Sequence, residues 1–247
     1  GSDLASMRTT AIHDGNGWRI NGAKTFITNG VHADLYFVAA KTGEPGRNRN
    51  ISMFAIEKGT PGFTVARELE KHGWWSSDTA ELHFEDCFVP DDQLIGEEGR
   101  GFYALVHNLQ NERIVLGAQA MGEATRALEL TLDWVKNRQA FGAPLWEKQT
   151  IRHRLAQRLA EVEAARALVF NTAWRDANGE RVTAEVSMIK ALCGELVNKV
   201  MYDCVQFHGG MGYMRESAIE RMSRDARVQA IGGGASEVML EEVAKRM

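Results

Sequence analysis

The sequence has few cysteines, and their arrangement excludes two kinds of stabilised fold. Cys87, Cys193 and Cys204 are far apart, odd in number and never spaced as Cys-x-x-Cys. A disulfide framework needs an even set of cysteines, and a structural zinc site needs clustered ligands. We therefore expect neither of these, and we expect a protein of a reducing compartment that is not secreted.

Long apolar runs and an excess of positive charge are also missing. No stretch approaches the roughly 18 apolar residues that indicate a membrane-spanning helix. Lysine and arginine total 29 against 33 aspartates and glutamates, which gives a net charge of −4 and disfavours binding to a nucleic-acid backbone. A chain of 247 residues with 44% hydrophobic and 25% charged residues has the composition of one or two globular domains.

Proline is scarce, and all four prolines precede residue 145. Since proline interrupts helices, the rest of the chain can form long ones. Short β-rich runs occur earlier, at 9–13, 18–21, 25–28, 35–40, 51–56, 63–65 and 80–84. Helical periodicity predicts helices at 101–138, 149–177, 183–208, 216–224 and 236–246. The pattern predicts an α+β protein, with an antiparallel β domain over 1–95 and a helical bundle over 96–247.

A carboxylate interrupts an apolar stripe on the first long predicted helix. Leu105, Leu109, Glu112 and Leu116 follow steps of four, three and four residues, with Val115 beside them, and so share one face. If that face is buried, desolvation raises the pKa of the acid toward the range of a general base. A structural reading, in which Glu112 pairs with an arginine such as Arg113, stays open from the spacing alone.

Two further features could contribute to a binding site. The run 230–237 is a glycine loop that leads into a helix with Ser236 as the predicted N-cap, and such a loop offers backbone N–H groups to an anion or a polarised carbonyl. Phe26 and Thr28 are two residues apart, which on a strand places both on one face. Each feature also occurs in ordinary packing, so neither alone assigns a function.

Seven short motifs occur in a fixed order along the chain, at 1–3, 24–30, 77–79 before 84–86, 112–113, 138–142, 206–213 and 224–227. Together they resemble the acyl-CoA dehydrogenase family of flavoproteins, over the whole chain. The resemblance implies a middle β domain followed by a C-terminal four-helix bundle. It also implies that the family's N-terminal helical domain is absent from this chain, and that 1–3 is a native motif rather than a cloning remnant.

The resemblance implies FAD as the cofactor and a homotetramer as the assembly. By this analogy Phe26 and Thr28 lie against the isoalloxazine ring. The residues that would reach the FAD of a neighbouring subunit are Arg138, Phe141, Gln206 and Gly210. Ser2, Arg113 and Arg181 match positions on the side of the acyl-CoA substrate.

The position of the catalytic base departs from the family's best-known members. Those members carry a catalytic glutamate where this chain has Gly233, whereas a subset resembling isovaleryl-CoA and long-chain acyl-CoA dehydrogenases carries it on the long helix, before an arginine. Glu112 and Arg113 match that subset. The resemblance therefore implies that Glu112 removes the α-proton, that the β-hydrogen passes as hydride to flavin N5, and that the N–H of Gly233 stabilises the enolate oxygen. The product would be a trans-2-enoyl-CoA.

Other implications concern partners and alternatives. The resemblance implies an electron-transferring flavoprotein as acceptor, a role in fatty-acid or branched-chain acyl-CoA metabolism, and a cytoplasmic or mitochondrial-matrix location. Ala140 and Ala235 stand where threonines commonly contact FAD, so a flavin-poor, non-catalytic subunit of a hetero-oligomer stays open. An acyl-CoA oxidase or a flavin monooxygenase on the same fold is the second alternative. The resemblance leaves open whether the shortened chain itself binds FAD and substrate normally.

Overall fold

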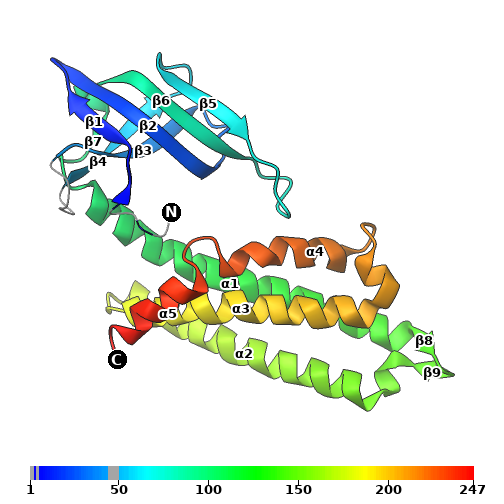
Figure 1. Cartoon of the computed structure of the whole chain (residues 1–247). Coiled ribbons are helices and arrows are strands. Elements are labelled where there is room, and N and C mark those ends of the chain that lie inside the picture. The colour runs from blue at the N-terminus through cyan, green and yellow to red at the C-terminus, as the bar shows by residue number, and fades with distance from the viewer. Residues whose placement is uncertain (1–2, 4–5, 44–49) are drawn as a thin grey trace. The chain divides into compact units, whose positions relative to one another are not determined.

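The computed structural model describes residues 3, 6–43 and 50–247 (Figure 1). The chain divides into two compact units, 1–108 and 109–247, and the division falls within helix α1 (Gly101–Asn137). No helix in the described part of the chain combines the length and the apolar composition that crossing a membrane requires.

The first unit is a twisted sheet whose strand order is β5-β6-β2-β1-β3-β4-β7. The strands are β1 (Thr10–His13), β2 (Gly17–Thr28), β3 (Leu35–Lys41), β4 (Ile51–Glu57), β5 (Phe63–Glu68), β6 (Thr79–Pro90) and β7 (Leu94–Ile95). Neighbouring strands in this described sheet pair antiparallel, except that β1 and β3 pair parallel. The sheet is therefore mixed, which corrects the expectation of an antiparallel sheet. Strand β3 follows β2 along the chain but pairs with β1, and it runs parallel to β1.

The core of this unit comes from side chains that alternate along the strands. Trp18 packs on Phe54 with ring centroids 5.6 Å apart, and Phe63 stacks on Phe84 at 5.1 Å. The predicted strands 18–21 and 25–28 are one strand, β2, whose pairing with β6 shifts between Lys24 and Ile27. That irregularity places Phe26 in the left-handed region, with φ of 61°.

The second unit is a helical bundle, and the predicted helices are confirmed within a few residues. Its helices are α1, α2 (Gln149–Ala177), α3 (Thr183–His208), α4 (Ala218–Ala226) and α5 (Ser236–Ala244). A small hairpin of β8 (Gln139–Ala140) and β9 (Ala143–Pro144) joins α1 to α2. One apolar core draws residues from α1, α2, α3 and α4, which confirms the expected four-helix bundle.

Close packing in the bundle depends on small residues at two crossings. A side chain at Gly117 on α1 would clash with Ile189 on α3. A Cβ atom at Gly194 on α3 would lie 2.5 Å from the carbonyl oxygen of Gln229, in the 3-10 turn Arg227–Ala230 that precedes the glycine loop. The second glycine therefore lets the loop lie directly on α3.

Candidate active site

The described site residues that the sequence predicted fall into separate places. Phe26 and Thr28 lie on the β unit. In the helical unit, Arg113 and Gly233 meet at the glycine loop. Arg138, Phe141, Gln206 and Gly210 lie near the end of α1 and the end of α3. Arg181 is exposed in the connection between α2 and α3, and Ser2 lies outside the described residues.

On the β unit, an aromatic ring and a hydroxyl group are presented to solvent. Phe26 is 78% exposed, and Thr28 at the end of β2 is also exposed. Ile27 between them is half-buried and pairs with Ala80. The strict alternation behind the prediction is interrupted, because Phe26 belongs to the irregular part of β2. The two side chains nevertheless remain available to a flat ligand.

Trp134 joins the end of α1 to the end of α3. Its indole stacks on His208 with centroids 5.1 Å apart, and its Nε1 donates to the carbonyl oxygen of Phe207 at 3.1 Å. The guanidinium of Arg138 lies 5.9 Å from the same indole ring. Gln206 and Gly210 flank this contact along the chain and are exposed. The structure therefore brings the predicted arginine, glutamine and glycine to one end of the bundle.

The hairpin between α1 and α2 extends this end of the bundle with an exposed ring. Phe141 is 97% exposed, and its φ of 54° and the φ of 77° at Gly142 form a tight turn between β8 and β9. Lys148 lies 5.7 Å from the centre of the Phe141 ring. An apolar ring that extends so far from its own unit is available to a ligand or to another subunit.

Two cations hold the glycine loop by its carbonyl oxygens. The Nε of Arg113 donates to the carbonyl oxygen of Gly233 at 3.1 Å. The Nζ of Lys190 donates to the carbonyl oxygens of Gln229 at 2.6 Å and of Gly234 at 3.0 Å. Figure 1 shows this loop, just before α5, beside α1 and α3. With those carbonyl oxygens engaged, the N–H of Gly233 donates to no acceptor in the described part of the chain.

The backbone conformation and the space at position 233 both favour glycine. Its φ is 69°, a conformation that side chains disfavour, and a Cβ atom there would clash with Leu116. Helix α5 begins directly after the loop, at Ser236. The predicted N-cap at Ser236 is wrong: its hydroxyl donates to Glu195 at 2.8 Å instead, and the cap position is Ala235, which makes no side-chain capping bond.

Lys190 is the site residue that the sequence reasoning missed. It is 1% exposed, on an α3 stripe that it shares with Val186, Cys193 and Val197 at helical spacing. Burial, and then the charge of Arg113, lower the pKa of Lys190 to about 8. Burial also lowers the pKa of Arg113, against the opposing charges of Glu242 and Glu112. A lysine on an apolar stripe is the same kind of signal that singled out Glu112.

The expected burial of Glu112 is wrong for this chain. Glu112 is exposed, and Leu105, Leu109 and Leu116 on its face are only half-buried. The buried face of α1 instead follows Gly117, Ala120, Met121 and Ala124, and the predicted stripe runs beside it. The neighbour of Glu112 on α1, Arg113, contacts Gly233 of the glycine loop directly.

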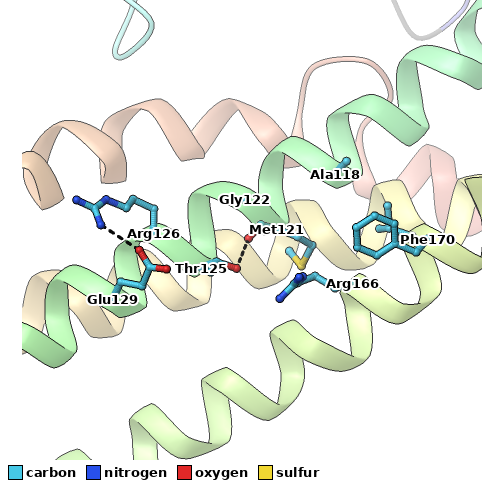
Figure 2. Close-up of a pocket in the computed structure, with 9 residues that line it drawn as sticks. Ala118, Met121, Gly122, Thr125, Arg126, Glu129, Arg166 and Phe170 are labelled. Carbon is cyan, nitrogen blue, oxygen red and sulfur yellow. Dashed lines mark hydrogen bonds and ion pairs between the residues drawn. The ribbon is translucent and has the colours of Figure 1, made fainter.

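A groove of about 340 Å³ lies elsewhere, between α1 and α2. Figure 2 shows Met121, Gly122 and Thr125 of α1 facing Arg166 and Phe170 of α2. An ion pair of 3.0 Å between Arg126 and Glu129 lies on its rim. None of the predicted site residues lines this groove, so it is separate from the glycine loop.

Family models match nearly the whole chain. The acyl-CoA dehydrogenase middle domain matches residues 1–87, and the acyl-CoA dehydrogenase C-terminal domain matches residues 99–247. The chain belongs to the acyl-CoA dehydrogenase family. Membership accounts for the order of the two units, a sheet followed by a helical bundle.

Relatives in this family are acyl-CoA dehydrogenases. The chain is 42% identical to the pig mitochondrial long-chain specific acyl-CoA dehydrogenase over 100% of its own length and 58% of the relative's. It is 41% identical to a Bacillus subtilis acyl-CoA dehydrogenase over 99% of its own length and 65% of the relative's. The crystal structure of a probable acyl-CoA dehydrogenase from Mycobacterium abscessus superposes with a TM-score of 0.98, at 47% identity, over 100% of this chain and 65% of that one. The chain thus spans about three fifths of the relatives it matches.

Proposed function

We propose that the protein catalyses the FAD-dependent α,β-dehydrogenation of an acyl-CoA thioester to a trans-2-enoyl-CoA. The observation that carries this proposal is the glycine loop. Arg113 and Lys190 engage the carbonyl oxygens of the loop, and the N–H of Gly233 is left without an acceptor among the described residues. A fixed, unengaged N–H group is what a developing enolate oxygen requires.

Glu112 acts in this proposal as the base that removes the α-proton. It precedes Arg113, which binds the loop, so its carboxylate is attached to the part of α1 that contacts the loop carrying the proposed enolate donor. This arrangement is that of the isovaleryl-CoA and long-chain type, and it needs no carboxylate at Gly233. In isolation Glu112 is exposed. The proposal therefore requires bound substrate or a further part of the protein to shield it from water before proton transfer.

The exposed groups on both units fit FAD. Phe26 offers a bare ring to a flat heterocycle, and the hydroxyl of Thr28 can hydrogen-bond at its edge. Arg138 can pair with a phosphate, while Gln206 and Gly210 present an amide and an accessible backbone beside it. FAD held by these residues would supply the acceptor for the β-hydrogen. The chain's own residues position the thioester and take up the proton.

Distances within the helical unit favour an assembly of several subunits. Arg138 directly follows the last residue of α1 and lies 25 residues beyond Arg113, which corresponds to about 37 Å at the helical rise. One dinucleotide is too short to contact the glycine loop and the Arg138 end together. We therefore infer that Arg138, Phe141, Gln206 and Gly210 bind the FAD of a neighbouring subunit in a homotetramer. The 97% exposure of Phe141 supports this inference.

The proposal also covers the acyl-CoA-binding residues, the electron acceptor, the cellular location and the roles of the two domains. Ser2, Arg113 and Arg181 are assigned to the side of the acyl-CoA. An electron-transferring flavoprotein is the proposed acceptor, in the cytoplasm or the mitochondrial matrix. The proposed domain roles are flavin and acyl-CoA binding for 1–95, and oligomerisation together with the catalytic base for 96–247.

A panel of acyl-CoAs tests the function. Protein of natural full length is mixed with straight-chain and branched acyl-CoAs and an artificial electron acceptor, and the acyl products are identified by mass. We expect a yellow protein and a product two hydrogen atoms lighter than one class of substrate. A colourless protein with no turnover would favour the flavin-poor subunit, and one equivalent of hydrogen peroxide per turnover would favour an oxidase.

A further inference from the structure

Among the described residues, the lysine beneath the glycine loop is buried with carbonyl oxygens, rather than a carboxylate, as its hydrogen-bond partners. Lys190 is among the largest side chains that are almost fully buried, and its hydrogen bonds in the described part of the chain go to the carbonyl oxygens of Gln229 and Gly234. Burying a charged amine is unfavourable unless its donors are satisfied. An apolar residue would fill the same stripe of α3 without that penalty, so packing alone does not account for a lysine.

The position of the ammonium group relates it to the proposed site. Its two acceptors lie on either side of Gly233, at Gln229 and Gly234, so the side chain holds both ends of the loop. The Cε of Lys190 would lie 3.6 Å from a Cβ atom built on Gly233. Arg113 holds the carbonyl oxygen of Gly233 from α1. Gly233, whose N–H has no acceptor among the described residues, is therefore flanked by two cations from two helices.

We propose that Lys190 is a positioning residue for the dehydrogenation: its ammonium group fixes the loop so that the N–H of Gly233 meets the thioester oxygen. This inference rests on the proposed function and deepens it. The positive charge of Lys190 also stabilises the negative charge that develops on that oxygen when the α-proton leaves, because the surroundings are buried and screen charges weakly. Lys190 itself does not contact the reacting carbon atoms.

Three variants separate positioning from simple packing. Lys190→Met keeps the length of the side chain and removes its donors and charge, whereas Lys190→Gln keeps donors without the charge. Lys199→Met changes an exposed lysine on the same helix and serves as the control. All are prepared in the full-length holoprotein, and flavin content is measured first.

The decisive readouts are the rate of flavin reduction at saturating acyl-CoA, the affinity for acyl-CoA, and hydrogen exchange of the loop amides. We expect Lys190→Met to lower the rate about ten- to a hundredfold with affinity nearly unchanged, since the loss falls on the transition state. Lys190→Gln should recover part of the rate, and Lys199→Met should match the unaltered protein. Amide exchange in residues 231–236 should rise about tenfold or more in Lys190→Met alone.

A second spectroscopic readout does not depend on hydride transfer. A non-oxidisable acyl-CoA analogue with an acidified α-proton is titrated in the site, and its apparent pKa should rise by about one unit in Lys190→Met because the enolate loses stabilisation. Unchanged reduction rates and an unchanged analogue pKa would overturn the proposal. If Lys190→Met loses its flavin, Lys190→Gln decides: a full rate together with unchanged loop amide exchange and an unchanged analogue pKa in that variant would overturn the proposal. An unaltered protein that no acyl-CoA reduces would instead overturn the proposed function itself.

Discussion

Replacing Gly194 by alanine should destabilise the helical unit, although alanine is the better helix former. The added Cβ atom would lie 2.5 Å from the carbonyl oxygen of Gln229 and 3.1 Å from the Cα of Ala230. Both are backbone atoms of the segment that leads into the glycine loop, so they cannot rotate away as a side chain could. Such overpacking costs about 1–3 kcal/mol, and a contact this short lies at the upper end of that range.

The helix propensity of alanine offsets about 1 kcal/mol of this cost. We therefore expect a net loss of roughly 2 kcal/mol in the free energy of unfolding, or a fall of about 4–8 °C in Tm for a chain of this size. Gly122→Ala is the matched control, because Gly122 is also inside a long helix and a Cβ atom there meets nothing within 4 Å. Thermal unfolding followed by circular dichroism should show a lower Tm for Gly194→Ala and an equal or higher Tm for Gly122→Ala. A Gly194→Ala variant as stable as the unaltered chain would refute the packing argument.

Two further predictions concern titration. Burial lowers the pKa of Lys190 to about 8, below the value of about 10.4 in an unfolded chain. Between these values the unfolded chain binds more protons, so the folded state gains stability as pH rises. The difference in the free energy of unfolding between the unaltered chain and Lys190→Met should increase by roughly 2 kcal/mol from pH 7 to pH 10. Urea titrations that give the same difference at both pH values would contradict this prediction. Burial also raises the pKa of Cys193 to about 12 and of Cys204 to about 11, and Cys87 is fully buried. None of these thiols should react with a disulfide reagent at pH 8 until the chain unfolds. A fast reaction of one thiol equivalent in the folded protein would contradict this prediction.

Much of the architecture could be predicted from the sequence because local signals agree with the fold. Prolines confined to the first part of the chain, together with helical periodicity, located α1, α2 and α3 closely. Strand boundaries were less accurate where the backbone leaves regular geometry, as at Phe26 in the irregular part of β2. The parallel pairing of β1 with β3 carries no local signal, since it depends on how distant segments meet.

The candidate site was predicted only in part, for a related reason. Periodicity finds an apolar face, but it cannot say which of two adjoining faces another helix covers. On α1 the covered face includes Gly117, and Glu112 beside it is exposed. On α3, a search for a charged residue on an apolar stripe would have found Lys190, whose side chain is buried. The acceptors of that lysine, Gln229 and Gly234, lie about 40 residues later, so only the folded chain reveals the pairing.

The identity of the base is the central claim, and anaerobic flavin reduction tests it most directly. Full-length protein with Glu112→Gln is mixed with saturating acyl-CoA, and the flavin absorbance near roughly 450 nm is followed by stopped flow, with Glu147→Gln at another exposed acid as the control. Glutamine cannot accept the α-proton, so we predict wild-type flavin content and acyl-CoA affinity, with reduction slower by about 10²–10⁴-fold. The control should reduce its flavin at the wild-type rate. Rapid bleaching in Glu112→Gln would contradict the account.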